Sequence, residues 1–327
     1  MTATIQSLLD RARQARADGD EEQCLVTLEA AQRESAQLEA HHALVQVVAW
    51  KRSKAEYDFG SPVRMLDALD PVIDQPDPFA HYPTALDAVE RLTRHFTDRV
   101  GYGDTRIDRL WTLWIAAQRR LGDTFLAEMG AMHVTWLAAC RGEVDHLRAE
   151  LNRVGAMSRK SFAGSLSKHI EAEDAGNSVF FVQMQVARAV LTGALWGHRE
   201  RLGWEAWQLY EDAIEEVGHD RSADFWYLST VARGGRRFGW PEAAATLLPL
   251  RRQLTERERD VHAALVAGEF DEDLDLLLWA ADEAIATHAG FEWAIDALLI
   301  ADGIAAGYRE RADELAKRYG VQVFLGF

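Results

Sequence analysis

The densest group of acidic side chains in the chain is the run DEDLD, from Asp271 to Asp275. Carboxylate oxygens suit Mg²⁺, which is often held by one or two carboxylates together with a substrate phosphate. The run also follows Gly268 and Glu269, at the predicted start of a helix, where the helix dipole stabilises acidic side chains. We interpret the run as the N-terminus of a helix rather than as a metal site.

In an acidic, tryptophan-rich and helical chain, the same run resembles the aspartate-rich motif of terpene cyclases. This resemblance implies Mg²⁺ held against a diphosphate substrate, and it requires a second motif built on Asn, Ser and Glu. The only asparagines are Asn152 and Asn177, and neither has the required neighbours. Because the second motif is absent, the sequence does not support this activity.

The histidines show no spacing that is typical of catalysis or metal binding. None of the eleven forms an HExxH or HxxxH pair. The densest His/carboxylate group, His169 to Asp174, spreads over more than one face of a helix. The chain also has no P-loop, no dinucleotide-binding fingerprint and no GxSxG motif. We therefore expect no catalytic residue, no metal, no cofactor and no enzyme activity.

Arginines gather shortly before glycines that end predicted helices. A guanidinium can hold a carboxylate through two parallel hydrogen bonds, which would suit a groove that binds an acidic partner or the C-terminal carboxylate of a peptide. The alternative is that these cations only stabilise helix ends through the dipole. The residues concerned are Arg13 and Arg16 before Gly19, Arg119 and Arg120 before Gly122, and Arg233, Arg236 and Arg237 before Gly239.

The elements that must position these side chains are helices. In the stretch 105–123, Ile107, Leu110, Trp111, Trp114 and Ile115 form one apolar face with helical spacing. Later stretches repeat this periodicity and close at glycines. No alternating apolar pattern with hairpin turns occurs, so the sequence predicts an all-α protein.

A fixed spacing follows several of the turn glycines. Gly19 is followed by Cys24, Leu28 and Ala31 at plus 5, 9 and 12. Glycine accepts the left-handed conformation that ends a helix, and small residues two turns apart allow the paired helix to approach closely. The spacing recurs, in full or in part, as Gly122 with Ala127, Ala131 and Val134; Gly142 with Leu147, Leu151 and Val154; Gly239 with Ala244 and Leu248; Gly268 with Leu277 and Ala280; Gly307 with Ala312, Ala316 and Tyr319; and, without the glycine, Ala206, Tyr210 and Ala213.

This spacing resembles the tetratricopeptide repeat, in degenerate form. In that family an aromatic residue early in the first helix precedes the turn glycine, and Trp111 stands eleven residues before Gly122. Predicted helix pairs start near Ser222, Thr255 and Phe291, about one 34-residue period apart. The resemblance implies an α-solenoid of stacked antiparallel helix pairs with a peptide-binding groove. A plain helical bundle is the alternative interpretation.

The domain organisation follows from the same resemblance. We expect a single solenoid over residues 1–327. The segment 155–176 is rich in Gly, Ser and charge. It either separates an N-terminal stack, 1–154, from a C-terminal stack, 177–327, or forms an irregular helix within one continuous solenoid.

Composition narrows the classes of partner. The net charge of −16 and a pI near 5.1 argue against general binding to nucleic acid or anionic membranes. Cys24 and Cys140 are too few for a disulfide framework. The N-terminus lacks the apolar region of a signal peptide, and no apolar run reaches the roughly 20 residues of a membrane span. We expect a cytoplasmic protein, and the excess of Arg over Lys indicates a bacterial source.

The eleven tryptophans fit an inter-helix core, and a minority of them could line a groove. Together these features predict a non-enzymatic scaffold or adaptor that binds a protein or peptide, which can be acidic, in a groove. Two alternatives stay open. One is a ligand- or peptide-responsive sensor module, and the other is a helical enzyme with unrecognised chemistry.

Overall fold

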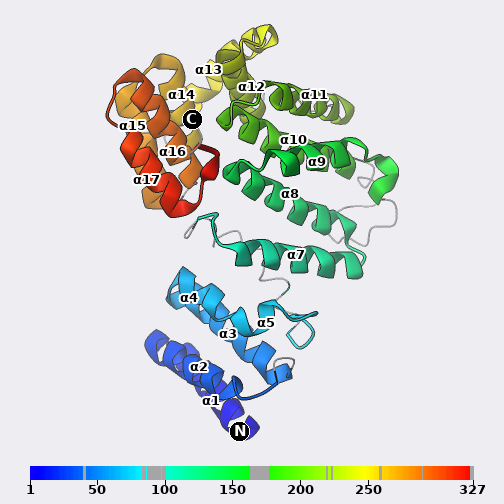
Figure 1. Cartoon of the computed structure of the whole chain (residues 1–327), viewed down its shortest axis with the longest axis vertical. Helices are drawn as coiled ribbons and strands as arrows, with labels where there is room; N and C mark the ends of the chain where they lie inside the picture. Colours follow the sequence, from blue (N-terminus) through cyan, green and yellow to red (C-terminus); the bar gives the residue numbers. More distant parts are fainter. Residues whose placement is uncertain are drawn as a thin grey trace. The chain divides into compact units, whose positions relative to one another are not determined.

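A computed structural model describes residues 1–39, 42–82, 86, 97, 101–162, 177–218, 220–221, 224–257, 260–288 and 290–324. Every regular element formed by these residues is a helix, as Figure 1 shows, which confirms the all-α prediction. The α-helices are α1 (Thr2–Ala17), α2 (Glu21–Ser35), α3 (Ala43–Phe59), α4 (Pro62–Asp67), α5 (Asp70–Ile73), α7 (Thr105–Arg120), α8 (Thr124–Arg141), α9 (Val144–Gly155), α10 (Ser178–Trp196), α11 (Glu200–Val217), α12 (Phe225–Phe238), α13 (Leu247–Glu256), α14 (Val261–Asp271), α15 (Leu274–Thr287), α16 (Phe291–Ile304) and α17 (Arg309–Tyr319). Short 3₁₀ helices are η1 (Arg159–Phe162), η3 (Pro241–Thr246) and η4 (Gln322–Phe324).

The chain divides into two compact units. Unit 1 comprises Met1–Val100 and Asp104–Ala117, and unit 2 comprises Gly101–Gly103 and Gln118–Phe327. The boundary falls within the last turn of α7, whereas the sequence pattern indicated a junction at 155–176. Residues 163–176 lie outside the described part of the chain, so a junction there stays a prediction.

The α1–α2 hairpin of unit 1 follows the predicted spacing. Gly19 has a φ of 76°, in the left-handed region that glycine adopts without strain. Asp20 then caps α2, because its side chain accepts a hydrogen bond from the backbone N–H of Gln23 at 3.0 Å. The residues at plus 5, 9 and 12 all lie in the buried core of this hairpin: Cys24, Leu28 and Ala31.

At two turns of unit 2 the same spacing starts from a residue other than glycine. Glu272, with a φ of 56°, forms the turn between α14 and α15, and Leu277, Ala281 and Ala284 follow it into the core at plus 5, 9 and 12. The assignment of Gly268 to this turn is wrong. Gly268 lies inside α14, where a Cβ would meet the Leu277 side chain at 2.7 Å. A search for glycine misses this turn because a glutamate adopts the left-handed conformation.

The α10–α11 hairpin has the same feature. His198, with a φ of 49°, occupies the turn, and Gly203 and Trp207 are buried five and nine residues later. The predicted positions in α11 are all buried: Ala206, Tyr210 and Ala213. The inward-facing side of α11 is therefore the one that the spacing predicts, although no glycine stands at the aligned position of the turn.

The turn after α12 is where the predicted spacing fails. Gly239 ends α12 with a φ of 74°, as expected. However, Ala244 is exposed and Leu248 is 65% exposed, so neither lies between paired helices. The chain enters η3 before it forms α13, and a 3₁₀ helix has three residues per turn, which changes the inward-facing positions. Ala243 is buried in place of Ala244.

Most of the other predicted repeat positions lie as expected, but Ala131, Val134 and Tyr319 are only half-buried. Gly122, Gly142 and Gly307 have positive φ values of 78°, 72° and 129°. The contact and aromatic positions nearest to these turns are fully or almost fully buried: Trp111, Ala127, Leu147, Leu151, Val154 and Ala312.

Helix α10 is central to unit 2. It packs against α8, α9 and α11, and Figure 1 shows these helices side by side. Its length and apolar composition would allow it to cross a membrane, and it is the one helix of the described residues that passes this test. In the folded chain 78% of that stretch is buried, as in the core helix of a globular domain, so it is weak evidence for a membrane segment.

The C-terminal residues pack into unit 2. Val321, Val323 and Phe324 are buried, and the ring of Phe324 lies 5.6 Å from that of Trp196 in α10. Residues 321–324 therefore form part of the core of unit 2. Residues 325–327 lie outside the described part of the chain.

Candidate functional site

A basic cavity of about 160 Å³ lies in unit 1. Leu9, Ala12, Cys24 and Leu28 form its apolar floor, and Tyr82 lies beside it. The cations that line it come from two helices: Arg13 and Arg16 from α1, and Lys51 and Lys54 from α3. We call these nine residues the basic cavity.

Helical spacing places these cations. Arg13 and Arg16 lie one turn after the buried Leu9 and Ala12, so they continue past the edge of the apolar face of α1. On α3, Val48 packs in the same core, and the lysines at 51 and 54 follow one and two turns later. The packing of α3 against α1 and α2 therefore brings the two basic pairs to one opening.

Among the described residues, the carboxylates of Asp10 and Asp58 partly neutralise this site. Asp58 on α3 forms ion pairs with Arg16 and, at 3.2 Å, with Lys54. Arg13 has a 71% exposed side chain and a 3.6 Å contact with Asp10 on its own helix. Among the residues that line the cavity, none is acidic. The region is thus positive within a chain whose net charge is −16.

Aromatic rings orient two of the cations. The Arg16 guanidinium lies 5.0 Å from the centroid of Phe59, and the Lys51 ammonium lies 5.7 Å from that of Tyr82. Both distances are typical of cation–π contacts, which hold a charge in place without neutralising it. Because no described residue accepts a hydrogen bond from Lys51, its N–H donors can serve an anion.

Cys24 on the cavity floor is not a nucleophile. Its side chain is buried, and burial raises the pKa of the thiol above the ordinary value. Reactivity requires the thiolate, which is scarce under these conditions. Cys24 serves as part of the apolar floor.

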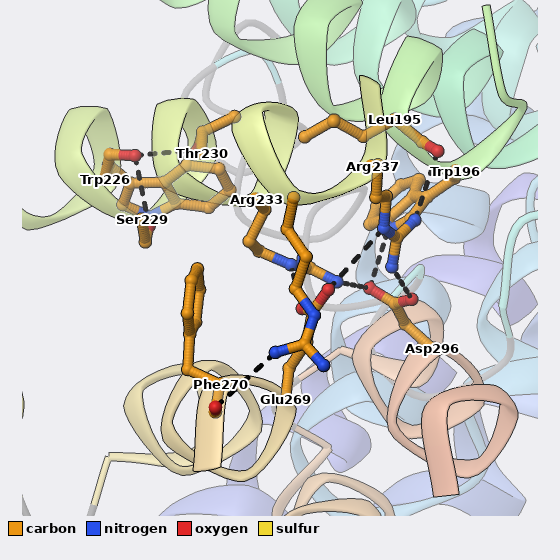
Figure 2. A network of polar contacts seen from close by, with 11 residues as sticks. Leu195, Trp196, Trp226, Ser229, Thr230, Arg233, Arg237, Glu269, Phe270 and Asp296 are labelled. Atoms are coloured by element: carbon orange, nitrogen blue, oxygen red, sulfur yellow. Dashed lines mark hydrogen bonds and ion pairs between the residues drawn. The ribbon is translucent and has the colours of Figure 1, made fainter. Parts of the chain in front are cut away.

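The arginines predicted in unit 2 have a different environment, shown in Figure 2. Arg233 on α12 is 4% exposed. Its Nε donates to Glu269 of α14 and its Nη2 donates to Asp296 of α16, both at 2.5 Å. Its charge is compensated by two buried carboxylates of its own chain.

Asp296 is the centre of this buried network. Arg237 donates to it at 2.9 Å, and the indole N–H of Trp196 donates to it at 3.0 Å. Burial alone would raise the pKa of Asp296, but the guanidiniums of Arg233 and Arg237 lower it far below the ordinary value. Arg237 also donates to the backbone carbonyl of Leu195 at 3.1 Å. These contacts join α10, α12, α14 and α16.

The remaining predicted arginines lie nearer the surface. Arg236 is 38% exposed and pairs with Glu272 at 3.0 Å. Arg119 is 57% exposed, with a 3.5 Å contact to Glu128, and Arg120 is exposed. The structure thus brings Arg233 and Arg237 together but gives the five arginines no common surface. Their role in partner binding stays a prediction, and for Arg233 the donors already have partners.

Lys51 and Lys54 are cavity residues that were not predicted from the sequence. A pattern could have found them, because the chain has only five lysines and two of them lie three residues apart on one helix. What the sequence does not show is that these lysines face Arg13 and Arg16, since that requires the packing of α3 on α1.

No protein-family model matches this chain, and neither a curated protein nor a solved structure matches it. Within the described residues, no group of His, Cys, Asp and Glu is arranged to hold a metal ion. Because no similar protein suggests a function, the function proposed below is inferred from the geometry of the site.

Proposed function

We propose that this chain is a non-enzymatic adaptor built of stacked antiparallel helix pairs, similar to tetratricopeptide repeats, and that its basic cavity binds an acidic segment of another protein. The observation that carries this proposal is the convergence of four cations on one small cavity whose lining contains no acidic residue, with the carboxylates of Asp10 and Asp58 beside them.

The size of the cavity favours a side chain over a larger ligand. A volume of about 160 Å³ suits one Asp or Glu side chain with part of its neighbour. Arg13 can hold a carboxylate through two parallel hydrogen bonds, and Lys51 adds a point charge. The apolar floor of Leu9 and Leu28 suits an aliphatic residue next to the acidic one. Nucleic acid is a poor candidate because the net charge of −16 repels phosphates.

The stacked-hairpin architecture is supported by the order of the elements. α8 and α9, α14 and α15, and α16 and α17 are consecutive contacting pairs, and α10 packs on both α8 and α11. Each pair buries an apolar residue five positions after its turn: Leu147, Leu277 and Ala312. In such arrays the first helices of successive pairs present their side chains on one surface. α1 and α3 supply the cations of the basic cavity in this manner.

The test uses two fluorescein-labelled peptides, ELEELE and its neutral counterpart QLQQLQ. Fluorescence anisotropy should show that the intact chain binds ELEELE at least about tenfold more tightly than QLQQLQ. In the variant Arg13→Gln with Lys51→Gln the affinity for ELEELE should fall about tenfold, since each lost charge contributes about 0.7 kcal/mol at 6 Å in water.

The matched control is Arg33→Gln with Arg64→Gln, which removes two exposed cations of unit 1 away from the cavity. It should bind like the wild type, and circular dichroism should show equal helix content in all proteins. Equal affinities of the wild type and the cavity variant for ELEELE would contradict the proposal, as would equal binding of the two peptides.

A further inference from the structure

A second candidate site lies in unit 2, around Arg188 of α10. The guanidinium of Arg188 lies over the ring of Trp226 in α12, 3.6 Å from the ring centroid. Its side chain is half-buried. Among the described residues, no carboxylate, hydroxyl or carbonyl accepts a hydrogen bond or forms an ion pair with it. Arg188 thus differs from Arg233, whose donors are held by Glu269 and Asp296.

The nearest acidic group does not replace such a partner. Asp224 is close enough to act on Arg188 electrostatically, but its carboxylate accepts the Tyr210 hydroxyl at 3.1 Å and caps α12 at the backbone N–H of Tyr227. Burial lowers the pKa of Arg188, although the group stays protonated at neutral pH. A half-buried cation without a direct counter-ion is costly for folding.

Further aromatic rings pack around Trp226, the ring beneath this guanidinium. Trp226 lies 6.2 Å, centroid to centroid, from both Trp136 of α8 and Trp293 of α16. His262 of α14 packs between Trp226 and Trp293, at 4.7 and 4.6 Å. The three tryptophans are half-buried, so part of each indole remains accessible. One charged donor is therefore placed among flat apolar surfaces.

We propose that Arg188 and the half-buried indoles of Trp136, Trp226 and Trp293 bind a small organic anion that carries both an aromatic ring and a carboxylate. The carboxylate receives the free N–H donors of Arg188, and the ring stacks on an indole. This site would make the chain responsive to a small ligand. It is independent of the basic cavity, because all of its residues belong to unit 2.

The probe is 3-phenylpropionate, compared by calorimetry with the neutral 3-phenylpropanol and with the ringless acetate. A ligand of this size is expected to bind with a dissociation constant on the order of millimolar. Both comparison compounds should bind at least about tenfold more weakly, because each lacks one of the two recognised features.

Three variants locate the site. Arg188→Gln should weaken binding at least about tenfold, and Trp293→Leu should weaken it severalfold. Arg201→Gln, which removes an 84% exposed cation on the neighbouring α11, should bind like the wild type. Folding of Arg188→Gln is expected, since the change removes an uncompensated charge, and thermal unfolding checks this point.

Each contrary result overturns the proposal. Unchanged binding in both Arg188→Gln and Trp293→Leu would place the ligand elsewhere. If Arg13→Gln with Lys51→Gln loses the binding of 3-phenylpropionate, the compound occupies the basic cavity of unit 1. If Arg188→Gln weakens the binding of the peptide ELEELE while 3-phenylpropionate does not bind, the site takes an acidic peptide and not a small aromatic acid.

Discussion

The α1 hairpin of unit 1 and the α12 turn of unit 2 carry arginines in the same register, yet the side chains have opposite environments. Arg13 stands six residues before Gly19, and Arg233 stands six residues before Gly239. Arg13 is 71% exposed on its side chain, whereas Arg233 is 5% exposed and bound to two carboxylates. The register sets where an arginine points, but the neighbouring helices decide whether its charge is already satisfied.

The difference lies in what the neighbouring helices supply. α14 and α16 present Glu269 and Asp296 to α12, so the arginines there hold helices together. α3 instead presents Lys51 and Lys54 to α1, which adds positive charge. The same local motif thus serves structure in one region and leaves a candidate binding site in the other.

The largest expected effect separates these two roles by stability. Arg233→Met leaves Glu269 and Asp296 buried with less compensation, so we expect a loss of about 3–5 kcal/mol in the free energy of unfolding. Arg13→Met should change it by less than about 0.5 kcal/mol, since the residue is exposed. Urea unfolding measures both. A loss below about 1 kcal/mol for Arg233→Met would mean that the network is not structural.

A second prediction concerns acid. Burial, with help from Arg233 and Arg188, lowers the pKa of His262 to about 3. An unfolded histidine binds its proton near pH 6.5, so between that pH and about 3 the unfolded state carries a proton that the folded state lacks. Stability should therefore fall as the pH decreases, by about 2 kcal/mol from pH 6.5 to 4.5.

The comparison variant is His262→Phe, which keeps a ring between Trp226 and Trp293 but cannot titrate. Its unfolding free energy should change little over the same interval. Asp296, whose pKa is lowered, loses its contribution to stability only below about pH 3.8, the ordinary pKa of an aspartate. Parallel pH profiles for the two proteins would show that His262 is not buried in its neutral form.

A third prediction tests the corrected register of the hairpins. Ala312 is fully buried after Gly307, so Ala312→Leu should overpack the α16–α17 hairpin and cost about 1–3 kcal/mol. Ala244 has the same place in the sequence pattern but is exposed, and Ala244→Leu should change stability by less than about 0.5 kcal/mol. Equal losses of stability in the two variants would mean that Ala244 faces inward, as the sequence pattern predicts.

These residues show how far the sequence could predict the structure. Periodicity predicts the helices and most inward-facing positions, because both depend on neighbours three and four residues apart. The turns at His198 and Glu272 escape prediction, since a left-handed conformation in a residue other than glycine is imposed by tertiary packing. The shift at Ala244 depends on a 3₁₀ helix after Trp240, which the repeat pattern does not contain.

The candidate sites were harder to predict than the fold. Arginine before a turn glycine is a local feature, and it indicated Arg13 and Arg233 equally. Only the packing of helices that are far apart in the sequence shows that Glu269 and Asp296 bind Arg233. The same packing places Lys51 and Lys54 in the cavity that Arg13 lines. For the same reason, the unpaired state of Arg188 is not visible in the sequence.

The smallest expected effect concerns Asp58, the carboxylate that pairs with Arg16 and Lys54 of the basic cavity. Asp58→Asn removes ion pairs whose basic partners are 40% and 48% exposed, so the loss of stability should stay below about 1 kcal/mol. The same change removes a repulsive charge near a bound acidic peptide. Since one charge at 6 Å contributes about 0.7 kcal/mol in water, the affinity for ELEELE should rise about threefold. Binding measured at two salt concentrations gives the check, because the gain should shrink as screening increases. If the affinity falls instead, Asp58 orders Arg16 and Lys54 for binding, and the cavity works through fixed geometry more than through net charge.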